Sequence, residues 1–278
     1  MRWLLQSKIL RALFYAAILV GVAACMHMPA STAVSVAELD DESAIEEDDQ
    51  IAAFSENQSD ALSPEWEPML FNRNKRRTEY AVVSDQGTKV LHARATNAAS
   101  GLMQKLSIDP LRDSRLTWEW RISRLVESAD NHDRAREDAP ARIILGFDGN
   151  KDDLPFADQI MFEAARAITG REIPYATLMY IRARKAPVDT VISNSRTGRV
   201  KMIVVATGKE GVGEWRAFSR DIAADFERAF GEKPGRLIAV GVLTDTDNTG
   251  ETVEAWYRDI QLRSNEPLVD LHLVETPP

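Results

Sequence analysis

The sequence has very little cysteine and histidine, the side chains on which much enzyme chemistry depends. Cys25 is the single cysteine among 278 residues, and the 4 histidines, His27, His92, His132 and His272, are scattered along the chain. A single cysteine excludes an internal disulfide and zinc sites built from several cysteines. The chain also lacks the His-Glu-x-x-His, Gly-x-Ser-x-Gly and phosphate-loop motifs. We therefore expect no catalytic residue of these classes, although the question of enzymatic activity stays open.

The first part of the chain lacks an apolar run long enough to span a membrane. Residues 12–24 are uncharged and mostly apolar, but they fall short of the ~20 residues that a spanning helix needs. Basic residues precede them, which predicts a signal peptide over residues 1–24. The tripeptide Val-Ala-Ala stands directly before Cys25, an arrangement that resembles the lipobox of bacterial lipoproteins.

This motif predicts where the protein is located. We expect cleavage before Cys25 and lipidation of its sulfur, so that the protein contacts the membrane through acyl chains. Met26 rather than aspartate follows the cysteine, which favours the outer membrane if the host has two membranes. Ordinary secretory cleavage and an uncleaved membrane anchor are the alternatives.

Basic residues are absent from residues 26–60, which hold ten acids. Such composition is typical of a solvated, disordered tether, and we assign residues 25–62 to the lipidated cysteine and this tether. The chain carries a net charge of −9, of which residues 1–60, with three bases and ten acids, contribute −7 and the remainder −2. A nearly neutral domain offers no broad basic surface, so we expect no nucleic-acid partner.

The pattern of the remaining chain predicts one β-rich domain over residues 63–265, followed by a tail over 266–278. Residues 116–122 alternate strictly, with leucine, tryptophan and isoleucine on one face and polar side chains on the other. Asp85-Gln86-Gly87 is a hairpin signal between two strand-like segments. The many short strands, separated by turn residues, indicate an all-β sandwich.

Two short helices are expected to interrupt the strands. The first carries an apolar stripe at helical spacing (Ala157, Ile160, Met161, Ala164 and Ile168), and the second follows Asp221 and ends before Gly231. Apolar stripes of this kind are usually packing surfaces. We therefore expect both helices to cover sheet edges or open ends of the sandwich.

The domain contains a series of short motifs. The most specific are Leu-Thr-Asp-Thr-Asp-Asn-Thr-Gly at 243–250 and Ala-Trp-Tyr-Arg-Asp-Ile-Gln-Leu at 255–262; others are Asp-Ala-Pro-Ala-Arg at 138–142, Pro-Tyr-Ala-Thr-Leu-Met-Tyr at 174–180, Gly-Glu-Trp at 213–215, Arg-Asp at 220–221 and Phe-Gly at 230–231. Together they resemble the bacterial domain-of-unknown-function family 3047. Arg182 departs from this pattern, because an aromatic residue commonly stands there.

The resemblance implies a shared fold but no activity. More loosely, a tryptophan followed by Arg-Asp and a closing aromatic strand is similar to jelly-roll carbohydrate-binding modules. This second likeness implies a jelly-roll-like β-sandwich with two short accessory helices, and fold alone does not determine function.

Candidate ligand-binding residues come from these motifs: Asp138, Arg142, Trp215, Trp256 and Asp259. Trp215 and Trp256 border turns and are candidates for an exposed stacking surface, with burial in the core as the alternative. Whether the charged members converge on one site cannot be decided from the sequence.

Asp245, Asp247 and Thr249 place oxygen atoms at alternate positions ahead of Gly250, as in the first half of a calcium loop. Trp256 stands where such a loop needs its bidentate glutamate. A tight turn stabilised by side-chain hydrogen bonds explains the same residues. We prefer the turn and keep a structural calcium ion as the alternative, with no other cofactor expected.

These observations favour a membrane-anchored envelope lipoprotein that binds a glycan or another envelope component without catalysis. A polysaccharide-active hydrolase or lyase on a sandwich fold is one alternative, and a protein-binding envelope scaffold is another. The three differ in the surface that they need: an aromatic-lined groove, converging carboxylates, or a flat apolar patch.

Overall fold

A computed structural model describes residues 50–264 of the chain, except 57–59, 72–73, 170–171 and 196. Cys25, the signal peptide, most of the tether and the C-terminal tail lie outside the described residues. Thirteen strands are present: β1 (Glu67–Met69), β2 (Glu79–Asp85), β3 (Thr88–Thr96), β4 (Ala99–Ile108), β5 (Arg115–Ile122), β6 (Arg142–Phe147), β7 (Ala176–Ala183), β8 (Val191–Ser193), β9 (Val200–Thr207), β10 (Arg216–Asp221), β11 (Leu237–Asp245), β12 (Thr252–Tyr257) and β13 (Gln261–Arg263). The helices are α1 (Phe156–Thr169), α2 (Ile222–Phe230) and a 3-10 turn, η2 (Lys151–Asp153).

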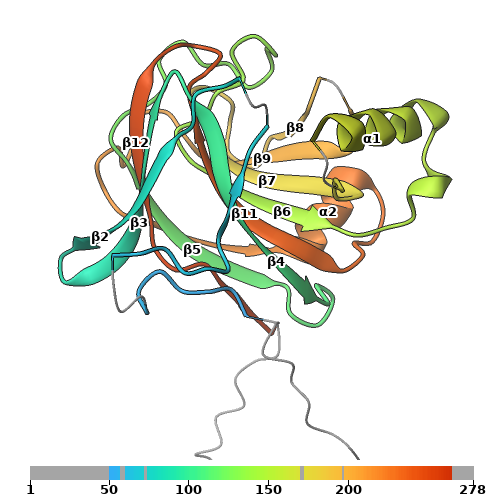
Figure 1. Cartoon of the computed structure of the whole chain (residues 1–278), viewed down its shortest axis with the longest axis horizontal. Coiled ribbons are helices and arrows are strands. Elements are labelled where there is room, and N and C mark those ends of the chain that lie inside the picture. Colours follow the sequence, from blue (N-terminus) through green and yellow to red (C-terminus); the bar gives the residue numbers. More distant parts are fainter. Residues whose placement is uncertain (1–49, 57–59, 72–73, 170–171, 196, 265–278) are drawn as a thin grey trace, which may run out of the picture. The chain divides into compact units, whose positions relative to one another are not determined.

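The strands form two sheets (Figure 1). Sheet A has the order β1-β4-β11-β6-β7-β9-β8, and sheet B has the order β10-β5-β12-β3-β2, with β13 also paired to β5. Eight of these strands can be numbered one to eight in chain order: β3, β4, β5, β6, β7, β10, β11 and β12. In this numbering, sheet B contains strands 1-8-3-6 and sheet A contains strands 2-7-4-5, each in order of pairing. This alternation between sheets is the jelly-roll arrangement of two Greek keys. The predicted jelly-roll-like β-sandwich with two short helices is confirmed.

Alternation along β5 decides which side chains enter the core between the sheets. Trp118 and Trp120 are 2% and 1% exposed, and Trp118 stacks on Tyr180 of sheet A with ring centroids 5.1 Å apart. Because successive side chains point to opposite faces, Glu119 and Arg121 lie on the outer face of sheet B. The predicted core face of this strand is confirmed, and the same alternation places its polar residues where a ligand can reach them.

The predicted turn and cap signals are also confirmed. Gln86 and Gly87 both have positive φ, 51° and 84°, as a tight hairpin between β2 and β3 requires. The Asp221 carboxylate accepts hydrogen bonds from Ala223 and Ala224 at the start of α2, and Gly231 ends that helix in the left-handed conformation. The second predicted cap glycine, Gly170, lies outside the described residues.

The predicted start of the domain at residue 63 is wrong, because the end of the assigned tether is packed onto the sandwich. Phe54 is fully buried and lies against Trp66, with ring centroids 5.0 Å apart. The Gln104 amide accepts from Ala52 N at 2.8 Å and donates to Gln50 O at 2.7 Å. One aromatic residue and these backbone contacts outweigh the acidic composition that suggested disorder. The folded domain therefore includes residues 50–56.

The expectation that the stripe on α1 is a packing surface is also wrong. Ile160 is 53% exposed and Phe156 is 75% exposed, while Ala157 and Ala164 are exposed as well. Phe162 is the buried side chain of this helix. The side of α1 that faces the sandwich is thus the one carrying Phe162, whereas Ala157, Ile160 and Ala164 of the predicted stripe face away from it. Among the residues described, no helix is both long and apolar enough to cross a membrane.

Candidate functional site

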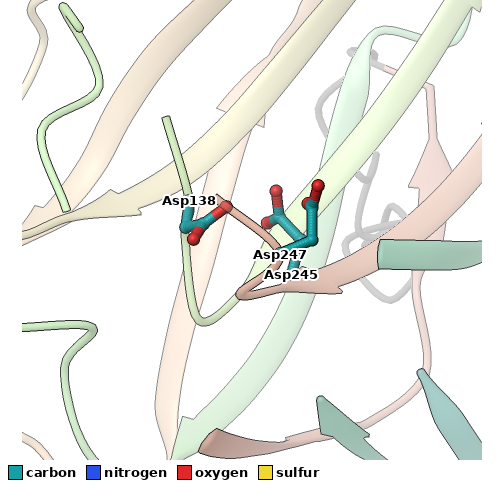
Figure 2. A group of neighbouring side chains, drawn as sticks. All are labelled: Asp138, Asp245 and Asp247. Carbon is teal, nitrogen blue, oxygen red and sulfur yellow. The ribbon is translucent and has the colours of Figure 1, made fainter. Parts of the chain in front are cut away.

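Three predicted aspartates meet at one end of the sandwich (Figure 2). Asp245 is the last residue of β11, Asp247 lies in the turn after it, and Asp138 lies in the segment before β6. One carboxylate oxygen from each lies within 4.8 Å of the others. β11 pairs with β6 through Leu243 and Arg142, and this pairing brings the two chain segments together.

Arg142 is the main partner of Asp245. Its Nε and Nη2 donate to the two Asp245 oxygens at 3.0 and 3.1 Å, and Ala139 N donates to the same carboxylate at 3.1 Å. Arg142 is 2% exposed. Burial raises the pKa of Asp245 to about 6, and Asp138 adds to this effect, while Arg142 opposes it. Burial alone would lower the pKa of Arg142, but the surrounding carboxylates, Asp245 first, raise it overall. The ion pair is thus buried, and each residue favours the charged form of the other.

The other two aspartates also have protein donors. Asp138 accepts from Thr249 N at 2.8 Å and from Thr249 Oγ1 at 2.7 Å, and Asn248 N contributes a third, longer bond. Asp247 forms an ion pair with Lys75. Five predicted residues, Asp138, Arg142, Asp245, Asp247 and Thr249, therefore lie together, in contacts that stabilise a turn. Calcium would have to compete with Arg142 and Lys75 for these carboxylates, so the geometry fits the turn better than a metal site.

Asp259 is not part of this cluster. β12 lies between the acidic turn and Asp259, and at ~3.3 Å per residue its six residues (Thr252–Tyr257) separate them by roughly 20 Å. Asp259 instead accepts from Ser55 N at 3.0 Å and from Ser55 Oγ. The predicted site residues thus fall into two groups, one at the end of the sandwich and one on the outer face of sheet B.

Asp259 of the second group lines a pocket of about 500 Å³, whereas Trp215 and Trp256 are not part of its lining. Polar side chains from several segments line it together with Trp118, Phe218 and Ala217: Ser55, Thr88, Lys89, Thr117, Glu119, Ser219, Arg258, Asp259 and Gln261. Glu119 and Arg258 form an ion pair across the pocket wall. The lining therefore offers hydroxyl, carboxylate, amide and cationic groups within one concave surface.

A row of stacked side chains runs across sheet B beside this pocket. Register places His92 of β3 opposite Trp256 of β12, and Trp256 opposite Arg121 of β5. His92 stacks on Trp256 at 4.9 Å, and the Arg121 guanidinium lies 4.5 Å from the same ring. Because its neighbours come from strands on either side, Trp256 has both ring faces covered. This leaves it little free surface for stacking on a ligand.

Trp215 lies differently, although it belongs to the same row. The guanidiniums of Arg258 and Arg121 lie 4.2 and 5.1 Å from its ring. Its Nε1 donates to Asp85 of β2 at 2.8 Å, and Arg121 also forms an ion pair with Asp85. Trp215 directly precedes β10, which is at the opposite edge of the sheet from β2. In a flat sheet these edges would be roughly 19 Å apart, so sheet B must curl around its outer face.

The loop before Trp215 is held in place by hydrogen bonds to Arg182 and Ile122. Arg182, 1% exposed, donates to Gly208 O at 2.8 Å and to Glu210 O, and Gly213 N donates to Ile122 O at 2.9 Å. Burial lowers the pKa of Arg182, helped by the nearby Arg216. The arginine that departs from the expected aromatic residue thus holds a loop in place, which positions Trp215 over the outer face of sheet B.

Several pocket residues were not among the sequence candidates. Glu119 could have been found, because the alternation of β5 directs it outward, and Arg258 and Asp259 lie between β12 and β13, which both pair with β5. Ser55 could not, because it belongs to the segment assigned to the tether. Its position depends on burial of Phe54.

The two most specific sequence motifs lie at these two sites. The motif at 243–250 forms the acidic turn, and the motif at 255–262 contains Arg258 and Asp259 of the pocket. The family model for proteins of unknown function DUF3047 matches residues 64–261. The chain belongs to the DUF3047 family. No curated protein matches this DUF3047 chain.

Three solved structures with similar folds have little sequence identity to the DUF3047 domain. A family 12 xyloglucanase from Bacillus licheniformis has 7% identity and a TM-score of 0.41, covering 78% of this chain and 97% of that chain. A mutant of a family 29 carbohydrate-binding module complexed with mannohexaose has 10% identity and a TM-score of 0.32, covering 78% and 89%. An arabinose-bound GH51 α-L-arabinofuranosidase has 9% identity and a TM-score of 0.38; the match covers 76% of this chain but spans only 25% of the arabinofuranosidase.

Proposed function

We propose that this DUF3047 protein is a lipid-anchored envelope module that binds a glycan in the pocket on the outer face of sheet B. The observation that carries the proposal is the pocket lined by Thr117, Glu119, Arg258, Asp259 and Gln261, beside an indole fixed by Asp85. Sugar hydroxyls both donate and accept hydrogen bonds, so carboxylates, amides and guanidiniums around one cavity suit them.

Trp215 lies next to this polar pocket, because its ring packs against Arg258, which is part of the lining. Aromatic rings stack on flat apolar surfaces, and the apolar face of a sugar ring is such a surface. Two guanidiniums and the hydrogen bond to Asp85 hold the indole before any ligand arrives. A side chain that is already ordered loses less conformational entropy on binding. Both indoles have two neighbours on their rings, and we prefer Trp215 to Trp256 because its neighbour Arg258 lines the pocket.

A non-catalytic role suits the two pocket carboxylates. Glu119 is paired with Arg258, and Asp259 is held by Ser55. A glycosidase needs one carboxyl group to donate a proton and a second to act as nucleophile or base, whereas here each carboxylate already has a partner within the protein. A polysaccharide hydrolase is the second candidate function, because Glu119 and Asp259 line one pocket.

Binding and cleavage can be separated with one set of variants. We expect the protein to retain oligosaccharides from a panel of peptidoglycan fragments, lipopolysaccharide core and neutral polysaccharides in a glycan array. Trp215→Ala and Gln261→Ala should each lower affinity at least about tenfold in calorimetry, whereas Asp247→Ala, at the other end of the sandwich, should not. Shortened products that depend on Glu119 and Asp259 would replace the binding proposal by the hydrolase.

Anchoring is part of the same proposal and rests on the Val-Ala-Ala-Cys25 signal. Cys25→Ser should abolish fatty-acid labelling and release the domain from membranes, and wild-type protein should fractionate with the outer membrane of a host that has two. Unchanged labelling in the variant would remove the lipoprotein assignment, while stable residence in the inner membrane would remove only the choice of membrane.

A further inference from the structure

Helix α1 presents an apolar surface to the outside of the domain. Phe156 and Ile160 are 75% and 53% exposed, the first being more exposed than any other large hydrophobic side chain in the described part of the chain. Ala157, Ala164 and Ala167 are exposed beside them. At 100° per residue these five side chains fall within an arc of about 100°. We name this surface the α1 stripe.

The opposite side of α1 is attached to the domain. Phe162 is buried, the Gln159 amide donates to Asp152 O and Leu154 O at 3.0 and 2.8 Å, and Thr197 Oγ1 donates to Asp158 at 3.3 Å. These contacts fix the helix so that its apolar side points outward. Figure 1 shows α1 at the periphery of sheet A, near β8 and β9.

An apolar stripe exposed to water is unusual on the surface of a folded domain. A surface helix normally buries its apolar side and exposes its charged side, and exposed apolar side chains gathered on one element mark an interaction site. The charged residues bordering α1 include the acids Asp152, Asp153 and Glu163 against the bases Lys151 and Arg166. Because acids and bases nearly cancel around α1, a strongly anionic partner would not be attracted electrostatically. Burial of the apolar side chains must therefore supply the binding energy.

The chain outside the described domain indicates what covers the stripe. Twenty-four residues (26–49) separate Cys25 from the first described residue. A chain of this length can reach at most about 85 Å. A domain of this size has a diameter of roughly 45 Å, so a lipid anchor at Cys25 keeps every face of the domain within reach of the bilayer.

We propose that α1 lies in the headgroup boundary of the membrane to which the protein is anchored, with the α1 stripe inserted into a zwitterionic lipid surface. This inference rests on the proposed lipidation of Cys25. A single short stripe binds weakly by itself, but tethering raises the effective concentration of bilayer around it. Contact through α1 would orient the domain on the membrane as well as anchor it.

The test uses the full lipidated protein in phosphatidylcholine vesicles. Acylation occupies the sulfur of Cys25, so a cysteine introduced at Ala164 is the single free thiol and can carry a nitrobenzoxadiazole label. Lipid-borne nitroxide should quench this label at least about twofold, with a blue-shifted emission. The same label at Leu111, which is 58% exposed on another part of the domain, should stay unquenched.

Two further variants separate the stripe from the anchor. Phe156→Ser with Ile160→Ser should remove quenching at position 164, whereas Val188→Ser, at a site 48% exposed, should not. Added phosphatidylglycerol should leave the quenching unchanged. Equal quenching at positions 164 and 111, or quenching unaffected by the double substitution, would overturn the proposal.

The remaining outcomes are also informative. A blue shift without vesicles that grows with protein concentration would assign the stripe to a second copy of the chain, and this would overturn the lipid proposal. Failure of the wild-type protein to float with vesicles would instead refute the anchor. Flotation therefore tests the lipidation on which the inference rests, and quenching tests α1.

Discussion

Replacing Arg142 with methionine should be among the most damaging single changes in the domain. Arg142 is 2% exposed, and its guanidinium donates to both oxygens of Asp245 and to Glu137 O. Methionine fills a similar volume but leaves Asp245 with one remaining donor, Ala139 N, and with Asp138 as a nearby acid. Loss of one partner from a buried ion pair costs about 3–5 kcal/mol. We expect Arg142→Met to lower the free energy of unfolding by this amount at pH 7.

The assay is urea unfolding followed by tryptophan fluorescence, with midpoint and m-value compared between variants. Arg142→Met combined with Asp245→Leu should recover most of the loss and lie within about 2 kcal/mol of wild type, because no charge is then left buried without a partner. Arg124→Met is the matched control. It removes an arginine that is 54% exposed and paired with Glu251, and exposed pairs contribute under about 1 kcal/mol. Similar losses for Arg124→Met and Arg142→Met, or a double variant as unstable as Arg142→Met, would refute the argument from burial.

Three other predictions follow from the same contacts. Between pH ~4 and ~6 the folded state holds a proton on Asp245 that the unfolded chain has released, because burial raises the pKa of this carboxyl from its ordinary value of 3.8 to about 6. Wild-type stability relative to Asp245→Asn should therefore fall as pH rises through this window, by roughly 1–3 kcal/mol in denaturation series, and a rising difference would contradict it. Trp120→Ala should cost about 3–5 kcal/mol, whereas Glu119→Ala, on the outer face, should cost under about 1 kcal/mol; comparable losses in thermal melts would mean that both faces of β5 are covered. Calcium and chelator should leave melting unchanged, while Asp138→Ala should cost about 1–3 kcal/mol through the unsatisfied Thr249 donors; stabilisation near 2.7 kcal/mol at a hundredfold excess over Kd would instead establish a calcium site.

The parts of the fold that sequence could predict are those fixed by local pattern. Alternation in β5, the hairpin at Gln86 and Gly87, and the caps of α2 at Asp221 and Gly231 depend on residues close together in the chain. The turn after β11 is different, because its Asn248 and Thr249 amides donate to Asp138, which is far away in the sequence, and its own aspartates bind Arg142 and Lys75. Arg142 and Asp138 contact this turn because β6 pairs with β11, which brings the motif at 138–142 next to the motif at 243–250.

The pocket and the position of Trp215 could not be predicted from the sequence, because both depend on how strongly sheet B curls. Asp85 and Trp215 are 130 residues apart and belong to opposite edges of the sheet, so no local pattern links them. Their hydrogen bond requires curvature, and curvature makes the outer face concave enough to hold a pocket. The same geometry explains why two tryptophans with similar sequence surroundings differ: Trp256 is in the middle of the sheet between two stacking neighbours, whereas Trp215 reaches over the face from its edge. The binding role that we propose for Trp215 therefore depends on the bending of the whole sheet, and removing the Asp85 contact should lower ligand affinity more than it lowers the stability of the core.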